Sequence, residues 1–471
     1  MAVYPWIKTS DKTYEQQYGF MERFFTRFLG EEGVPSQFTI MATVEFRVAG
    51  AQSDDLESRL RKTWRAMRYN SPSVAALSGP KGKIYRIPND VALADWETTT
   101  FKRHPPGTTA EKLFGSIDRA ALITLHFLPG AGNAPDAHQI VLQAEHQNID
   151  GRGVFYLIHR FWTVFTTPSL LSTPPFGDEW TRLPPAMDDL LSLPAQPSPA
   201  DHSLAAEWIA PLASVTPLGI LIPASHSPTQ LPTTSLRALL RLSQLETAAL
   251  IAACKAHSLT VTSAWVAALA LALAAAQTTS GQPLPADAAL VSFATCDMRR
   301  YFPHATFDPT SAPVACYHAA IPTALRIDGG KASFLDLAAE MKHEFHGGSV
   351  TAARGRAWAP FVGLMGDVVV AAATAAGSGN ARRSAPLISS LGVVDDFVEK
   401  SYDGEGGEVE VLDVWIADTM MSSTNLWMLH TWDGMLNLSV TYNEAYFPVG
   451  LMEGVLERIW EELRSGLGLV L

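Results

Sequence analysis

The chain has 471 residues, of which 47% are hydrophobic and 17% are charged. Burial of this much apolar surface can offset the entropy lost when the backbone is ordered, which excludes a mostly disordered protein. The formal net charge of −12 argues against a nucleic-acid partner, because affinity for a phosphate backbone comes from cations that neutralise it.

The first part of the chain mixes strand and helix patterns. Residues 38–48 (FTIMATVEFRV) are rich in β-forming side chains and predict a strand. Ser53 then caps a helix in which apolar residues recur every three or four positions. Three further runs are expected to be strands: 83–87, 120–127 and 139–146. A helix is expected to follow the last of them, over 152–165.

Prolines mark the boundary between two parts of the chain. Of the 31 prolines, 13 lie within residues 168–232, where they disfavour helices and central strands. This density predicts a crossover linker over 181–234, in which 201–209 can form a helical turn or two. We therefore expect an N-terminal domain over 1–180 and a C-terminal domain over 235–471.

The C-terminal part repeats the mixture. A strand over 235–242 is followed by Ser243 and Glu246, which form a capping box that opens a helix. The most apolar run, 261–276, has 13 residues after its polar start; it is shorter than the ~20 needed to span a bilayer and predicts a core helix. Two more helices are expected over 333–346 and 448–463. Four late strands are expected over 386–393, 409–416, 425–432 and 435–442.

The string EHQNIDGRG at 145–153 carries the most chemical information. It follows an alternating strand and precedes an apolar helix, so His146 is expected at a corner where scaffolds often place reactive side chains. A neutral imidazole can take a proton from an alcohol or amine as it attacks a carbonyl. Asp150 can brace the loop, and a buried carboxylate needs a partner. The candidate is an arginine of the downstream string DMRR, Arg299 or Arg300.

HQNIDG and DMRR together resemble the motifs of the chloramphenicol-acetyltransferase-like superfamily. That group includes BAHD acyltransferases, alcohol acetyltransferases and peptide-synthetase condensation domains, which share an HxxxDG motif. The resemblance extends over about 141–463, through the helix LTVTSAWVAALALAL, the segment ISSLGVVDDF and the ending LNLSVTYNEAYF. The chain is most similar in character to fungal secondary-metabolite O-acetyltransferases of the trichothecene 15-O-acetyltransferase type.

The resemblance implies an α/β fold of the α+β layered kind, with two chloramphenicol-acetyltransferase-like domains. Each would be a mixed β-sheet flanked by helices, with an active-site tunnel at their interface. It implies that His146 is the general base, that Asp150 pairs with Arg299, and that Gly151 allows close backbone approach. The implied reaction is direct transfer in a ternary complex, in which the acceptor oxygen attacks an acyl thioester and CoA leaves.

Further site residues are weaker candidates. Ser389 or Ser390 can offer a hydroxyl to a developing oxyanion. His430 can line the tunnel, although a core histidine explains it equally well. Arg382 and Arg383 can grip CoA phosphates, because the guanidinium fork suits phosphate, but a solvated basic loop is the simpler interpretation.

Departures from the superfamily narrow the assignment. Condensation domains usually carry a second histidine just before the motif, where this chain has Glu145. The BAHD motif DFGWG is absent, and ISSLG is its nearest replacement. The lack of HExxH, GxSxG, a Walker loop and a strand-linked GxGxxG argues against hydrolases, NTPases and dinucleotide enzymes. Ser78 and Lys81 fit an SxxK pattern, but in a Pro/Gly loop instead of a helix start.

The sequence therefore predicts an acyl-CoA:alcohol O-acyltransferase, most simply an acetyltransferase, acting on a hydrophobic secondary metabolite. Acyl-CoA is expected as a co-substrate, with no permanently bound cofactor and no metal ion. We expect a cytoplasmic monomer without membrane insertion, since the start of the chain lacks a signal-peptide pattern and Cys254, Cys296 and Cys316 suit a reducing compartment. The alternatives are a condensation-like or cyclising enzyme that uses His146 on another substrate, and a non-catalytic binding module.

Overall fold

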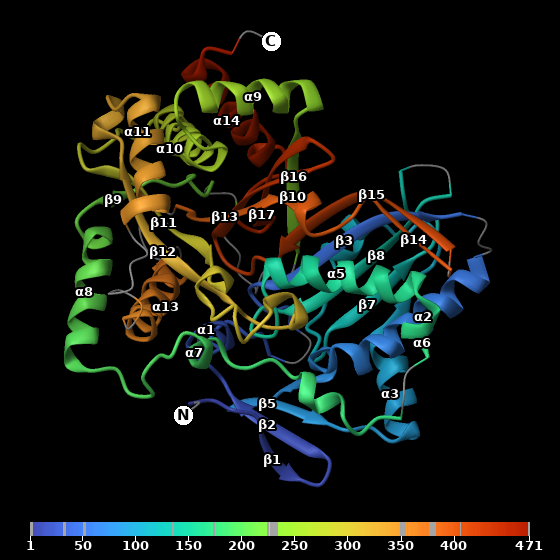
Figure 1. Ribbon diagram of the computed structural model, residues 1–471. Helices are drawn as coiled ribbons and strands as arrows, with labels where there is room; N and C mark the ends of the chain where they lie inside the picture. Colours follow the sequence, from blue (N-terminus) through green and yellow to red (C-terminus); the bar gives the residue numbers. More distant parts are fainter. Residues whose placement is uncertain are drawn as a thin grey trace. The chain divides into compact units, whose positions relative to one another are not determined.

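The structure is a computed structural model of the chain. It describes all residues except 1–2, 32–33, 50–52, 134–135, 173–174, 224–225, 227–233, 349–354, 356, 376–382, 406 and 470–471. The chain divides into two compact units, each assembled from three segments (Figure 1). The first unit comprises 1–195, 297–318 and 393–419, and the second comprises 196–296, 319–392 and 420–471.

The first unit combines residues 1–195 with two segments from the C-terminal part of the chain, 297–318 and 393–419, whereas the second unit lies entirely within 196–471. Most of the expected linker belongs to the second unit, where a 15-residue helix, α8 (Pro199–Ala213), replaces the expected turn or two. The helix forms in this proline-rich stretch because Pro199 occupies a first-turn position, where a missing N–H costs nothing, and Ser198 and Asp201 form a capping box.

The first unit contains a six-stranded sheet in the order β14-β15-β3-β8-β7-β6. Its strands are β14 (Ser401–Gly404), β15 (Gly407–Asp418), β3 (Thr39–Val48), β8 (His138–Glu145), β7 (Thr124–Leu128) and β6 (Phe101–Arg103). Every neighbouring pair is antiparallel except β6 and β7. Along β3, the first eight side chains are all buried, as expected of a central strand.

Helices and a second sheet complete the first unit. The helices are α1 (Phe20–Thr26), α2 (Ser53–Asn70), α3 (Asp90–Thr100), α4 (Ala110–Phe114), α5 (Gly151–Thr166), α6 (Pro168–Leu171) and α7 (Met187–Leu190). Helix α5 contacts α2, β14 and β15. The smaller, antiparallel sheet has the order β1-β2-β5-β4, with β1 (Ile7–Ser10), β2 (Thr13–Gln17), β5 (Gly82–Arg86) and β4 (Leu77–Ser78).

The second unit is built on a seven-stranded mixed sheet. Its order is β10-β17-β16-β13-β11-β12, with β9 paired to β11. The strands are β9 (Thr216–Pro217), β10 (Ser235–Arg241), β11 (Ala288–Asp297), β12 (His318–Arg326), β13 (Ala385–Val393), β16 (Thr424–Trp432) and β17 (Met435–Asn443). Besides α8, the helices are α9 (Gln244–Ala256), α10 (Val261–Thr279), α11 (Phe334–His343), α13 (Trp358–Ala375) and α14 (Leu451–Leu467).

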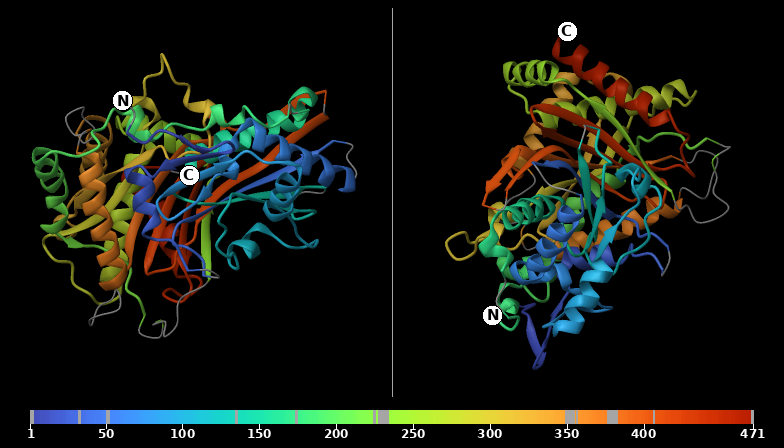
Figure 2. Two further views of the ribbon diagram at one scale, coloured as in Figure 1. Left: turned by 90° about the horizontal axis from the view of Figure 1, so that it is seen from below. Right: turned by 90° about the vertical axis from the view of Figure 1, so that its right-hand side faces the viewer.

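Helix α10 is the core helix of the second unit. It contacts α11 and α14, and Figures 1 and 2 show α14 beside it. It has 19 residues: a capping box at Thr260 and Ser263 starts it at Val261, where the apolar run begins, and it continues past the end of that run to Thr279. Among the described residues it is the one helix long and apolar enough to cross a membrane, yet 67% of its most apolar window is buried inside the protein.

The expected fold class is therefore confirmed. The chain contains two sheet-based units with flanking helices, and most expected strands appear within a few residues of their predicted bounds.

Candidate active site

His146 directly follows β8, and α5 begins five residues later, so the motif lies at the strand–loop–helix corner that the sequence indicated. Asp150 is the N-cap residue of α5, and its side chain accepts a hydrogen bond of 2.7 Å from the backbone N–H of Gly153. An aspartate at this position satisfies an otherwise unpaired amide at the start of the helix. The motif therefore fixes its own helix start.

Asp150 also binds two residues of another segment of the first unit, 297–318. Its Oδ1 accepts a hydrogen bond of 3.0 Å from Arg299 Nη1, and its Oδ2 accepts one of 2.6 Å from the backbone N–H of Tyr317. Burial works against ionisation, but the Arg299 charge and these hydrogen bonds hold the pKa of Asp150 below its usual range. The structure thus places Asp150 against Arg299, as expected.

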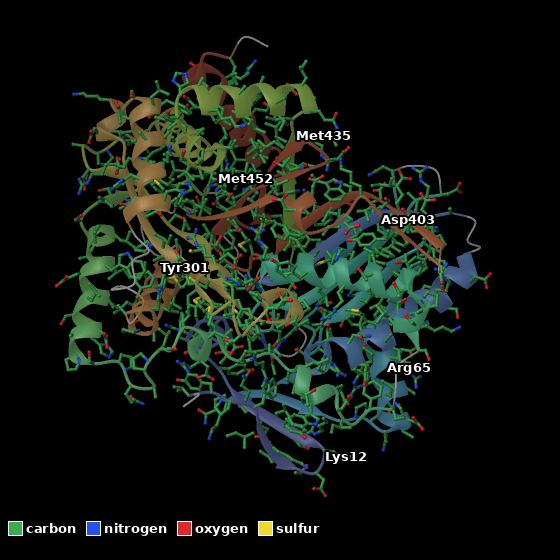
Figure 3. The ribbon with its side chains drawn as sticks, in the orientation of Figure 1. Lys12, Arg65, Tyr301, Asp403, Met435 and Met452 are labelled. Carbon is green, nitrogen blue, oxygen red and sulfur yellow. The ribbon has the colours of Figure 1, made fainter. Side chains whose placement is uncertain are left out.

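The rival partner lies elsewhere. Arg300 is exposed, and its guanidinium lies over the ring of Tyr301, which Figure 3 labels. Asp297 also contacts Arg299, with 3.2 Å between Oδ1 and Nη1, so the guanidinium bridges two carboxylates. Arg299 and Asp150 have only 3% and 2% of their surface exposed, which makes this a buried ion pair.

Close packing in the motif occurs at Gly153. A Cβ atom there would lie 2.3 Å from the carbonyl oxygen of Pro313 and 3.2 Å from Arg299 Nη2. Gly151, the glycine expected to allow close backbone approach, is the first residue of α5. The sequence pattern missed Gly153, although it is visible as the second glycine of EHQNIDGRG.

The loop between β8 and α5 is held from a second side by β4. Ser78 Oγ donates a hydrogen bond of 2.8 Å to Asn148 Oδ1, and Gln147 Nε2 lies 3.3 Å from the same hydroxyl. Ser78 therefore supports the motif loop, a role that its SxxK spacing did not suggest.

The imidazole of His146 is held mainly by packing. Its ring stacks on Phe25 of α1, with 3.9 Å between centroids and 5° between planes. The ring of His318 lies 5.0 Å away, and Asp418 Oδ2 lies 3.9 Å from His146 Nε2. The side chain of His146 is 13% exposed, and its Nδ1 has no hydrogen-bond partner among the described residues. The ring is thus oriented by neighbouring rings instead of by hydrogen bonds.

These surroundings set the charge states. Burial, and then the neighbouring His318, lower the pKa of His146 to about 3, so the ring is neutral at pH 7 and keeps a lone pair. Burial alone raises the pKa of Asp418 to about 7. A carboxyl so shifted beside a neutral imidazole is typical of functional sites.

Sequence reasoning missed Phe25, His318 and Asp418. They come from α1, the start of β12 and the end of β15, far from the motif in the chain and without a motif of their own. The three cysteines are free and buried, as expected. Cys316, however, lies beside this site, with Sγ 3.7 Å from His318 Nδ1.

The candidate oxyanion and tunnel residues lie in the second unit. Ser389 and Ser390 belong to β13, where Ser390 Oγ lies 2.9 Å from Thr262 Oγ1 and Ser389 Oγ lies 3.5 Å from Thr295 Oγ1. His430 lies in β16 and is buried. Their roles near a substrate stay predictions.

The candidate CoA-phosphate arginines are described only in part. Arg382 lies outside the described residues. Arg383 is half-buried, forms an isolated β-bridge with Leu221, and approaches the Pro217 carbonyl oxygen, with 3.4 Å from Nη1. A phosphate role for either arginine stays a prediction.

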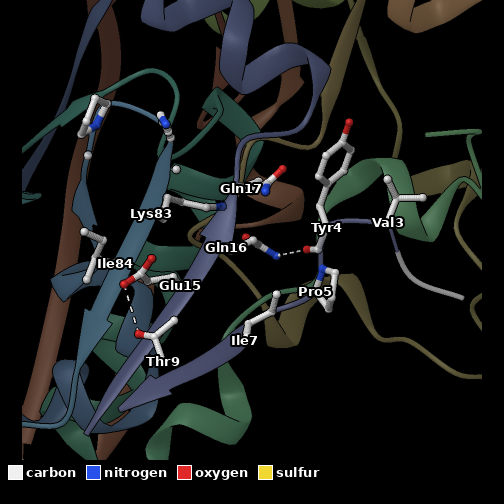
Figure 4. A pocket seen from close by; sticks show the side chains of 14 residues that line it. Val3, Tyr4, Pro5, Ile7, Thr9, Glu15, Gln16, Gln17, Lys83 and Ile84 are labelled. Carbon is white, nitrogen blue, oxygen red and sulfur yellow. Dashed lines mark hydrogen bonds between the residues drawn. The ribbon is translucent and has the colours of Figure 1, made fainter. Parts of the chain in front are cut away.

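One pocket of the first unit lies away from His146. It has a volume of about 380 Å³ and is bounded by β1, β2, β5 and residues 3–5 (Figure 4). Gln16 donates a hydrogen bond to the Tyr4 carbonyl oxygen across it, and its one buried cation, Lys83, is paired with Glu22. None of the residues described around His146 lines this pocket.

Comparisons with known proteins agree with the motif. No family model matches the chain. The acetyltransferase pigO of Monascus ruber is 25% identical, with 99% of this chain and 98% of that protein covered. The O-acetyltransferase pigM of the same organism is also 25% identical, with 88% and 77% covered.

Solved structures share the fold. TRI3 trichothecene 15-O-acetyltransferase from Fusarium sporotrichioides has a TM-score of 0.80 at 16% identity, with 98% of each chain covered. SgcC5 from Streptomyces globisporus has a TM-score of 0.63 at 14% identity, with 96% of this chain and 98% of that chain covered. The two acetyltransferase relatives and the shared fold confirm the resemblance seen in HQNIDG and DMRR and support an acyltransferase.

Proposed function

We propose that the chain transfers an acyl group, most simply acetyl, from acyl-CoA to a hydroxyl of a hydrophobic secondary metabolite, with His146 as general base. The observation that carries the base assignment is a neutral imidazole, seated on Phe25 at the end of β8, whose Nε2 faces the Asp418 carboxyl. The acetyltransferases of Monascus ruber, one of them an O-acetyltransferase, support acetyl transfer to a hydroxyl, and the trichothecene 15-O-acetyltransferase TRI3 has the same fold.

The proposed reaction is a direct transfer. His146 accepts the hydroxyl proton as the acceptor oxygen forms a bond to the thioester carbonyl carbon. The resulting oxyanion collapses and breaks the carbon–sulfur bond. The departing CoA thiolate takes the proton back from the imidazolium, which leaves an ester, a thiol and a neutral His146. No covalent acyl-enzyme forms.

Asp418 is placed to stabilise the protonated form of His146 that this scheme requires. A base whose pKa is lowered to about 3 holds a proton poorly, so the imidazolium needs stabilisation as it forms. The Asp418 carboxylate, 3.9 Å from Nε2, is positioned to supply it. At an effective dielectric constant of about 20, two unit charges at this distance attract by about 4 kcal/mol. In this scheme Asp418 is a positioning and charge-stabilising residue.

The decisive experiment incubates acyl-CoA with a panel of hydrophobic alcohols and follows the release of free thiol. The native protein should turn over at least one alcohol, and His146→Ala should lose about 10²–10⁴-fold in rate, the usual contribution of a general base. The matched control is His202→Ala, since His202 is an exposed histidine of α8. Full activity in His146→Ala with a normal melting temperature would refute the base assignment.

The same assay separates the alternatives. A condensation-like or cyclising enzyme would use a carrier-bound thioester in preference to free acyl-CoA, and a binding module would release no thiol from either donor. We further propose a cytoplasmic monomer with no nucleic-acid partner, no membrane insertion and no permanently bound cofactor. Size-exclusion chromatography, cell fractionation and the absorbance spectrum of the purified protein test these points.

A further inference from the structure

We propose that Cys316, His318 and His146 form a binding site for a thiophilic divalent cation such as Zn²⁺, and that its occupancy inhibits the transferase. The inhibition rests on the proposed function, whereas the binding does not. Of all the residues that the structure describes, these three form the one group of histidine, cysteine and acidic side chains with the spacing for a metal ion.

The distance between two of the ligands fits zinc. Zinc binds thiolate sulfur at about 2.3 Å and imidazole nitrogen at about 2.0–2.1 Å, so a tetrahedral site separates the two atoms by about 3.6 Å. Cys316 Sγ and His318 Nδ1 lie 3.7 Å apart. The two residues are two apart in sequence, and in an extended chain this spacing puts both side chains on one face.

His146 supplies the third ligand. One ligand atom from each of the three side chains lies within 4.8 Å of the others. Two imidazole nitrogens on one tetrahedral zinc are separated by about 3.4 Å, so a shift of at most about 1.4 Å closes the site. The ring of His146 is stacked on Phe25, and no hydrogen bond to a described residue holds its Nδ1 in place. Three protein ligands leave a fourth position for water.

The ligand set can balance the charge of a bound cation. A metal ion displaces the proton of a thiol that coordinates it, so Cys316 would bind as a thiolate. The Zn²⁺–thiolate unit keeps one positive charge, and the Asp418 carboxyl beside His146 is placed to neutralise it. The transfer mechanism moves no proton through Cys316 or His318, so the site gives a ligand role to two buried side chains beside the base.

Occupancy blocks the base. A metal ion bound to His146 takes the lone pair that must accept the hydroxyl proton, and its water ligand fills space beside the ring. We therefore expect Zn²⁺ to inhibit turnover, and a chelator to restore it.

Co²⁺ binding to the metal-free protein tests the site without any activity. Tetrahedral Co²⁺ with a cysteine ligand should give visible d–d bands and a near-ultraviolet sulfur-to-cobalt band. Cys316→Ser should abolish the sulfur band, and His318→Ala should weaken Co²⁺ binding by about 10–100-fold or more. The control is Cys254→Ser, which changes a buried thiol in the core of the second unit. Melting curves verify that each variant is folded.

The outcomes separate the proposals. A near-ultraviolet band that is missing from the native protein, or that survives in Cys316→Ser, overturns the metal site. Zinc inhibition is measured in each variant relative to its own metal-free rate, and Cys316→Ser should raise the inhibitory Zn²⁺ concentration by about 10–100-fold. Equal inhibition of Cys316→Ser and Cys254→Ser overturns the inhibitory role. A normal Co²⁺ spectrum in a protein that turns over no alcohol supports the site and contradicts the proposed function.

Discussion

Replacing Asp150 with alanine removes the acceptor of three hydrogen bonds and takes from the buried Arg299 guanidinium one of the two carboxylates that it contacts. The donors are Arg299 Nη1 at 3.0 Å and the backbone N–H groups of Gly153 at 2.7 Å and Tyr317 at 2.6 Å. Breaking a buried ion pair costs about 3–5 kcal/mol, and losing an N-cap costs about 1 kcal/mol. Because one carboxylate makes all these contacts, the costs overlap, and we expect unfolding free energy to fall by about 4 kcal/mol.

Three variants separate the contributions to this loss. Asp150→Asn keeps an N-cap side chain of the same shape but removes the charge, so it should lose about 2 kcal/mol. Asp150→Ala combined with Arg299→Met should lose less than the sum of the single changes, because neither charge is then stranded. The assay is the denaturant midpoint and the melting temperature, with thiol release followed on the same preparations.

The pH dependence has a definite sign. The pKa of Asp150 is lowered in the folded protein, so the stability from its ionisation is present above the unfolded-state pKa of about 3.9 and is lost as the pH falls through the folded-state pKa. The difference in unfolding free energy between the native protein and Asp150→Asn should be constant near neutral pH and should disappear at acidic pH. Loss of rate in Asp150→Ala with an unchanged melting temperature would refute the structural role and place Asp150 in the chemistry.

Three further predictions concern neighbouring positions. Asp418→Asn should lower kcat/KM about 10–100-fold. In the native protein kcat/KM should rise near pH 7, because Asp418, with a pKa of about 7, ionises there, and the variant should lack this rise. An unchanged pH profile would contradict the role of Asp418. Gly153→Ala should lower the unfolding free energy by about 1–3 kcal/mol through the clash with Pro313, whereas Gly454→Ala, in the open on α14, should be neutral or stabilising; equal melting temperatures would contradict this. Phe25→Leu should reduce the rate more than the stability, because the stacked ring orients His146; a normal rate would show that stacking is dispensable.

Local patterns were sufficient for the centre of the site. The strand QIVLQAE and the apolar helix after it placed His146 at a corner, and the cost of an unpaired buried carboxylate predicted a cationic partner for Asp150. That partner is Arg299, 149 residues away. Both predictions follow from the chemistry of a single residue and the sequence pattern around it, and neither requires the topology of the sheet.

The positions of Phe25, His318 and Asp418 beside His146 depend on how distant strands and helices pair, which the local sequence pattern does not determine. Strand β15 is rich in β-forming side chains, like the strands that follow it, and the sequence assigned it to the C-terminal domain. In the structure it pairs with β3, with Asp418 opposite Ile40, in the sheet of the first unit. Alternation shows that a strand has a buried face but not which sheet receives it. Asp418 therefore could not be placed beside His146 from the sequence.

The site combines two acid–base pairs that are built for opposite purposes. Asp150 and Arg299 touch at 3.0 Å, with the carboxylate also held by backbone N–H groups, so their charges persist and hold the loop. His146 and Asp418 are 3.9 Å apart, and burial disfavours charge on both. A pair of this second kind gains most when a proton arrives at the imidazole, because only then do opposite charges face each other in a low-dielectric site. Stabilisation that appears with the transferred proton lowers a barrier, whereas an ion pair already formed at rest could only hold the structure.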